Sequence, residues 1–189
     1  MPPDVRRSAR LLQLLVVALS LIAAGVVGAL GGFARADGHK QLPAGAIDQP
    51  IDAGSWQVTV HSASAGTRLH GNKANDGTYL IEVEATVLIK DSRTRAVFDV
   101  LQLEGVPDVQ SKEADLTSVR DERLASYLQP GLAERIAFAW EVKSTTPVPK
   151  EVRVIVVGEH PRPTNFYFLG ETMHDQAPQA AVTVSVVAR

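Results

Sequence analysis

The residue types that most often do chemistry are scattered in this sequence. The five histidines have no second histidine or carboxylate at metal-ligand spacing on an expected helix: His39, His61, His70, His160 and His174. We therefore expect solvated surface histidines and no metal site, with a site assembled from distant strands as the alternative. Cysteine is absent, which excludes disulfides, thiolate zinc sites, iron–sulfur ligation and cysteine nucleophiles.

Two other groups of polar residues could serve chemistry in principle. Glu82 and Glu84 are two residues apart in an alternating segment, so they share one strand face about 7 Å apart, which is within reach for acid–base work. On an outward face such a pair is usually solvated, and we expect that here. Asn72, Asn75 and Asp76 put oxygen atoms in one loop but lack the closing bidentate Glu of a calcium loop, which favours turn chemistry.

Signatures of nucleophilic and nucleotide chemistry are missing. The chain has no Gly-x-Ser-x-Gly elbow, no phosphate-binding loop and no dinucleotide fingerprint. His61 and Ser62 are neighbours in an expected strand, so their side chains point to opposite faces. The sequence thus predicts no catalytic residue and no cofactor, and an enzyme with a site dispersed over several strands is the weakest alternative.

Length and charge limit the classes further. The 189 residues are enough for one domain with a substantial core. The net charge of −2 gives no indication of nucleic-acid binding. The charge is uneven, because residues 1–36 carry four Arg and one Asp (+3), whereas residues 37–189 carry 15 basic and 20 acidic residues (−5).

The first part of the chain has the pattern of a membrane segment. Residues 11–34 contain no charged residue and follow the basic residues 1–10, so the N-terminus is expected in the cytoplasm and the rest outside. The length favours a retained transmembrane anchor. The alternative is a signal peptide cleaved after Ala36, at Ala34-Arg35-Ala36, which would give a secreted protein. Gly25, Gly28 and Gly32 have the small-residue spacing of helix packing in membranes.

The pattern of the remaining residues predicts a linker followed by an all-β domain. Residues 35–54 are rich in Gly, Pro, Ala and Asp and predict a tether, whereas residues 55–189 show a period of two. About seven strands in an antiparallel immunoglobulin-like sandwich are expected, within residues 56–60, 79–90, 96–103, 136–142, 152–157, 165–169 and 182–186. A short surface helix or turn is expected over Val119–Leu128, with Leu124, Tyr127 and Leu128 under a sheet edge.

Binding is the function that these features favour. The loop Glu104–Asp115 carries four acidic residues against one lysine, and we predict Asp108, Glu113 and Asp115 as contacts with a protein partner. A strand edge is the other expected contact surface. The aromatic run Asn165–Phe168 would form an apolar interface patch if it were exposed, and core packing is the alternative.

Several motifs together resemble a known group. They are an Arg-flanked apolar helix, Gly54–Val58, the strand Tyr79–Lys90, Arg120-Asp121, Leu128–Leu132 and Trp140-Glu141-Val142. The pattern is similar to actinobacterial exported or membrane-anchored proteins with an immunoglobulin-like β-sandwich, the immunoprotective extracellular immunoglobulin-like antigen group. The resemblance covers about residues 50–189 and implies an extracytoplasmic address without a catalytic residue. We expect a non-enzymatic, membrane-anchored module that binds another envelope or membrane protein, or alternatively a secreted ligand-binding or antigen-like protein.

Overall fold

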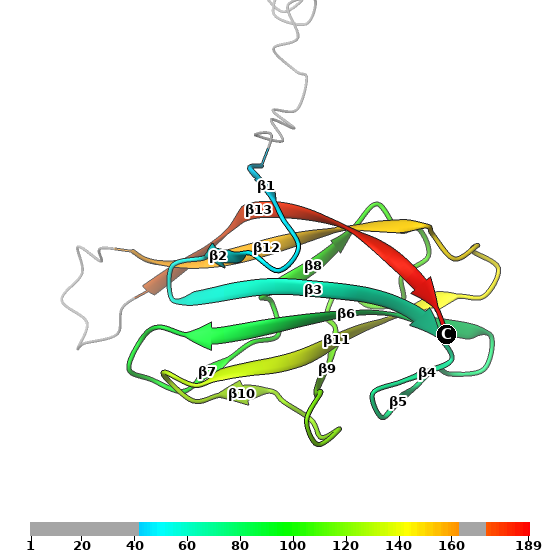
Figure 1. The fold of residues 1–189 in the computed structure, drawn as a ribbon, viewed down its shortest axis with the longest axis horizontal. Coiled ribbons are helices and arrows are strands. Elements are labelled where there is room, and N and C mark those ends of the chain that lie inside the picture. The colour runs from blue at the N-terminus through cyan, green and yellow to red at the C-terminus, as the bar shows by residue number, and fades with distance from the viewer. Residues whose placement is uncertain (1–41, 163–172) are drawn as a thin grey trace, which may run out of the picture. The chain divides into compact units, whose positions relative to one another are not determined.

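The computed structural model describes residues 42–162 and 173–189, and within these ranges the protein is all-β (Figure 1). The folded unit runs over Leu42–Arg189. No helix in the described residues is long and apolar enough to cross a membrane. The expected segment 11–34, with Gly25, Gly28 and Gly32, lies outside the described residues, as does the expected strand 165–169.

The strands are β1 (Ala44–Gly45), β2 (Pro50–Asp52), β3 (Trp56–Gly66), β4 (Arg68–Leu69), β5 (Asn72–Lys73), β6 (Thr78–Ile89), β7 (Arg95–Ala96), β8 (Leu101–Glu104), β9 (Asp115–Ser118), β10 (Tyr127–Leu128), β11 (Ala133–Lys143), β12 (Glu151–Arg162) and β13 (Met173–Ala188).

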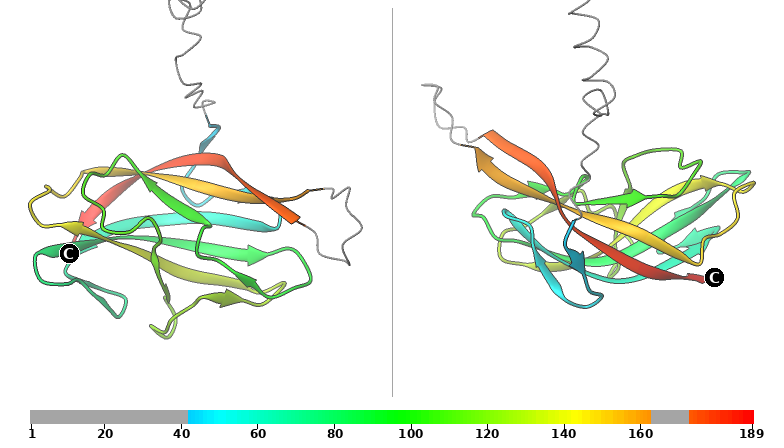
Figure 2. Two further views of the ribbon diagram at one scale, coloured as in Figure 1. Left: turned by 180° about the vertical axis from the view of Figure 1, so that it is seen from behind. Right: turned by 90° about the horizontal axis from the view of Figure 1, so that it is seen from above.

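Most strands belong to one curled sheet with the order β8-β12-β13-β3-β6-β11-β9. The pairs β3–β6, β6–β11, β11–β9, β12–β13 and β12–β8 are antiparallel, but β13 pairs with β3 and with β1 in parallel. Seen from behind, β8 lies in front of β3 and β6 because the sheet curls over itself (Figure 2). The domain is therefore β-sandwich-like, but it is a mixed half-barrel and not the purely antiparallel sandwich expected from the sequence.

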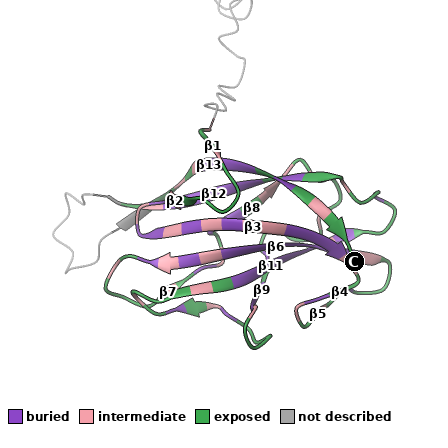
Figure 3. Cartoon of the chain, viewed as in Figure 1, coloured by how far each residue is buried: buried purple, intermediate pink, exposed green. Residues whose placement is uncertain are grey.

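The core fills the inside of this curl. The alternating apolar residues of the long strands point inwards, and Val58, Val83, Phe138, Val154 and Val182 are all completely buried. Buried positions alternate along β3 and form long runs on β6 and β11 (Figure 3). The period of two in the sequence follows from packing one face of each strand on the core, and the longer buried runs arise where the outer face is covered as well.

Local structure differs from the expectations in two places. Of the helix and the turn expected over Val119–Leu128, the structure has the turn, followed by extended chain, because its backbone pairs with neighbouring strands: Thr117 forms a bridge with Leu124, and β10 pairs with β7. Leu128 is buried as expected, but Leu124 and Tyr127 are exposed. The predicted strand 96–103 is broken by a turn between β7 and β8.

The predicted linker also ends earlier than expected. β1 and β2 lie within residues 35–54, where β1 pairs with β13 and β2 pairs with β3. Ile51 packs against the core, and Ala53 is completely buried in it. The folded unit therefore begins at Leu42, and the described part of the predicted tether belongs to the domain. Prolines and glycines at a sheet edge produce the same composition as a linker.

Candidate functional site

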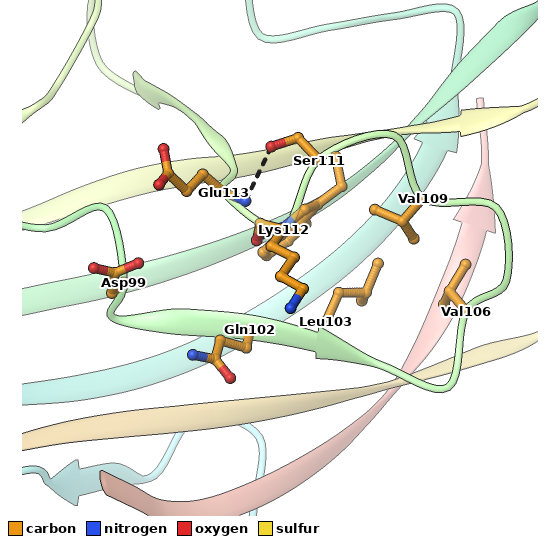
Figure 4. A pocket seen from close by; sticks show the side chains of 9 residues that line it. Asp99, Gln102, Leu103, Val106, Val109, Ser111, Lys112 and Glu113 are labelled. Carbon is orange, nitrogen blue, oxygen red and sulfur yellow. Dashed lines mark hydrogen bonds between the residues drawn. The ribbon is translucent and has the colours of Figure 1, made fainter. Parts of the chain in front are cut away.

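A groove lies between β8 and the loop that connects β8 to β9. Its volume is about 500 Å³, which falls in the range of ligand-binding pockets. Apolar side chains line one part of it and polar side chains the rest; they belong to Asp99, Gln102, Leu103, Val106, Val109, Ser111, Lys112, Glu113 and Trp140. Figure 4 shows the Lys112 side chain extending from the loop towards β8, with Leu103, Val106 and Val109 grouped beside it.

The backbone of β8 borders this groove as a sheet edge. β8 pairs with β12 on one side, and among residues 42–162 and 173–189 no strand pairs with its other side. The amide of Val157 donates to the carbonyl of Val100, which sets the alternation of the antiparallel ladder. In that alternation Gln102 and Glu104 bond to β12, so the N–H and C=O groups of Leu101 and Leu103 point away from it. Leu101 is buried within the fold, so Leu103, which is partly exposed, is the residue that offers its backbone groups at the open edge.

The structure brings only one of the three predicted partner contacts to this groove. Glu113 lines it, and its amide donates to Ser111 Oγ at 3.1 Å. Asp108 adopts a positive φ of 58°, and its Oδ2 accepts a hydrogen bond of 2.7 Å from Thr146 Oγ1, which fixes the loop. Asp115 is exposed at the start of β9 and does not line the groove.

The second candidate site is on the outer face of β6. The polar residues of this face were expected to be solvated, but each has a partner from another segment. Glu82 contacts His70, Glu84 contacts Arg135, Thr86 contacts His61, and Lys90 contacts Asp52. The hydrogen bond from Lys90 is the main reason why the pKa of Asp52 is lowered. The expectation that Glu82 and Glu84 are solvated is therefore wrong, because both are buried, whereas Lys90 on the same face is exposed.

His70, Glu82 and Glu84 form the buried part of this face. His70 Nδ1 lies 2.5 Å from Glu82 Oε1, and His70 Nε2 lies 3.8 Å from Glu84 Oε1. Glu82 is completely buried and Glu84 is 7% exposed. Burial raises the pKa of Glu82, while the hydrogen bond and charge of His70 oppose that rise. Arg135 holds Glu84 Oε2, with Nη2 at 2.7 Å and Nε at 2.9 Å.

The hairpin of β4 and β5 places His70 over the carboxylates. His70 and Gly71 form its two-residue turn, and both have positive φ, as the tight turns of β-hairpins require. Asn72 anchors the hairpin to β9, because Thr117 Oγ1 donates to Asn72 Oδ1 at 3.1 Å. Residues Ala137 and Ala139 lie opposite Glu84 and Glu82 on β11 and are small. His70 was expected to be a solvated histidine. This expectation is wrong, because the hairpin holds the His70 side chain against the buried glutamates.

The same face carries a chain of three polar groups around His61. Asp48 Oδ1 lies 2.5 Å from His61 Nδ1, and His61 Nε2 lies 2.8 Å from Thr86 Oγ1. A carboxylate, an imidazole and a hydroxyl in this order occur in nucleophilic hydrolases. Here the Asp48 side chain is 70% exposed, and the chain of contacts ties the segment before β2 to β3 and β6. We therefore assign it a structural role.

Sequence reasoning missed the His70 cluster because the spacing of its members matches no metal-ligand pattern. The signal that could have found it is the dipeptide His70-Gly71, a two-residue turn candidate directly before the strand that carries both glutamates. A hairpin of that size folds back on a neighbouring strand. Residue spacing alone does not show which face of the strand it covers.

Comparisons with known proteins give a fold-level likeness. No family model matches the chain. No curated protein matches it either. The chain is structurally similar to an uncharacterized β-sandwich protein of Clostridium difficile 630, with 11% identity, a TM-score of 0.46, and coverage of 76% of this chain and 95% of that one. A conserved hypothetical protein from Bacillus anthracis has 18% identity, a TM-score of 0.32, and coverage of 59% and 88%. The similarity is thus to uncharacterized bacterial proteins, including a β-sandwich protein.

Proposed function

We propose that this protein is a non-enzymatic interaction module that captures an extended segment of another envelope protein along β8. The observation that carries the proposal is the open edge of β8 beside an apolar groove. An unpaired edge offers backbone donors and acceptors to an incoming strand, and neighbouring pockets select its side chains. Leu103 supplies the exposed backbone groups, and Leu103, Val106 and Val109 supply the apolar lining.

The proposed partner segment is extended and apolar at its centre. Its side chains would pack on Leu103, Val109 and Trp140, where transfer from water is favourable. Lys112 and Glu113 at the polar part of the groove would fix its register by charge. This assigns Glu113 a contact role, whereas Asp108 positions the loop and Asp115 lies outside the groove.

The proposal includes a place at the outer side of the cell membrane. It is supported by the basic residues 1–10, the uncharged segment 11–34 and the resemblance to immunoglobulin-like exported antigens. A retained anchor holds the module near membrane partners, so that a weak interface is sufficient. The second candidate is a secreted binding protein that begins at Asp37. Intact mass and carbonate-washed membranes separate the two, because the anchored form is full-length and stays with the membrane.

Crosslinking in the native host tests the groove. A photoreactive amino acid at Ser111, at the groove rim, is expected to give one discrete adduct whose crosslink maps to an extended segment of an envelope protein. Leu103→Lys places a charge in the apolar lining and is expected to reduce the adduct at least tenfold. Leu124→Lys is the matched control, because Leu124 is 79% exposed elsewhere on the surface. An adduct that survives Leu103→Lys, or that Leu124→Lys abolishes equally, would contradict the proposal.

A further inference from the structure

The outer face of β6 holds two glutamates in an environment that carboxylates rarely occupy. Glu82 is completely buried, and Glu84 is more than nine-tenths buried. Buried carboxylates are paired with charges, bind a cation or become neutral, because burial removes their hydration. Within residues 42–162 and 173–189, His70 hydrogen-bonds Glu82 at Oε1, and Glu82 Oε2 has no hydrogen-bond partner.

We propose that His70, Glu82 and Glu84 bind one Zn²⁺ ion. One nitrogen of His70 and one oxygen of each glutamate lie within 4.8 Å of one another. Zinc holds imidazole nitrogen and carboxylate oxygen at about 2.0–2.2 Å, so tetrahedral ligand atoms are roughly 3.4 Å apart. Side-chain rotations that move the three donor atoms by about 1 Å bring them to that spacing. The 2.5 Å contact of His70 with Glu82 is then exchanged for coordination.

The surroundings of the cluster suit a cation with an imidazole ligand. Arg135 binds Glu84 Oε2, which orients the carboxylate so that Oε1 faces His70, and such supporting contacts are typical of metal ligands. The unpartnered Glu82 Oε2 is an acceptor that a cation would satisfy. Hard cations prefer six or more oxygen ligands, whereas one imidazole with two carboxylates suits zinc.

Access and the remaining coordination position come from the hairpin turn. The His70 side chain is 17% exposed at the tip of the β4–β5 hairpin, so one edge of the cluster reaches solvent. Three protein ligands leave a fourth zinc position for water at that edge. The groove beside β8 lies on the inner side of the sheet, so this inference is independent of the proposed function.

Zinc titration of the full-length protein tests the inference. The detergent-solubilised protein is stripped with a chelator and titrated with Zn²⁺ against a chromophoric competitor. One site per chain is expected, with affinity reduced at least tenfold in Glu82→Gln and in His70→Gln. His61→Gln is the matched control, because His61 makes the same 2.5 Å contact with an exposed carboxylate. No site, equal affinity in Glu82→Gln, or loss in His61→Gln would overturn the proposal and leave His70 as a hydrogen-bond partner of Glu82 alone.

A second measurement keeps the test decisive if a variant does not fold. X-ray absorption of the zinc-loaded wild-type protein is expected to show a nitrogen and oxygen shell at about 2.0–2.1 Å with one imidazole. Two or more imidazoles would place the ion at other histidines and overturn the assignment. A large excess of Ca²⁺ is expected not to displace the zinc, and displacement would overturn the choice of metal.

Discussion

Removing His70 tests how strongly the buried glutamates depend on it. In His70→Ala, the completely buried Glu82 loses its contact at Oε1 while its Oε2 already has no partner. Breaking a buried pair by deleting one partner costs about 3–5 kcal/mol. His70 is 17% exposed, which lets water reach part of the vacated space, so the lower end of that range, about 3 kcal/mol, is expected. For a unit of about 150 residues this lowers Tm by roughly 6–12 °C.

A double-mutant cycle separates the charge effect from general packing. In Glu82→Gln the buried group is neutral, so a further His70→Ala is expected to cost only about 1 kcal/mol, the usual value of a hydrogen bond. The coupling between the two positions is then about 2 kcal/mol. His61→Ala is the control, because the contact of His61 with Asp48 is equally short but Asp48 is 70% exposed, and it is expected to cost about 1 kcal/mol or less.

Urea unfolding of the full-length protein with a chelator present measures all these variants. The free energy of unfolding comes from the midpoint and slope of each transition. The reasoning would be refuted if His70→Ala cost no more than His61→Ala. It would equally be refuted if His70→Ala cost as much in the Glu82→Gln background as in the wild type.

Other predictions concern backbone, core and metal. Gly77→Ala is expected to lower the free energy of unfolding by about 1–2 kcal/mol. The positive φ alone causes this loss, because no atom lies near the new Cβ. Gly54→Ala is expected to cost clearly more, because its Cβ would lie 2.1 Å from the Glu159 carbonyl oxygen; equal Tm losses would contradict this. Trp140→Phe removes the 3.3 Å hydrogen bond to the Lys112 carbonyl and is expected to lower the free energy of unfolding by about 1 kcal/mol. A loss well below that value would show that the bond does not contribute. Zinc at a hundred times its Kd is expected to stabilise the wild type by about 2.7 kcal/mol in thermal unfolding, and a gain in Glu82→Gln above about 1.4 kcal/mol, the value for a tenfold weaker site, would contradict the assignment.

The alternation of side chains made the core predictable but not the curvature of the sheet. The apolar positions of β6 and β11 are buried where the sequence places them, because a strand with one buried face must alternate. Alternation carries no information on the direction of the neighbouring strand. The parallel pairing of β13 with β3 and the inclusion of Ile51 depend on contacts between the two ends of the domain, which local pattern does not encode.

The candidate sites were predictable only in part for the same reason. The loop 104–115 was recognisable by its charge, and the structure places part of it beside a groove. Its net charge did not reveal that Asp108 binds Thr146 within the fold, or that Glu104 pairs with Arg153. The polar face of β6 was recognised correctly as polar. Its burial depends on the β4–β5 hairpin, and a short hairpin changes a solvated carboxylate into a buried one without changing the strand pattern.

The central claim is that a partner strand adds to the open edge of β8. Its most direct test is amide hydrogen exchange of the full-length protein, with and without a synthetic peptide of the segment identified by crosslinking at Ser111. Strand addition predicts slower exchange at the amide of Leu103, which points away from β12 and is partly exposed, and unchanged exchange at Gln102, which already bonds to β12. Binding that leaves Leu103 unprotected, or that protects an edge other than β8, would contradict the account.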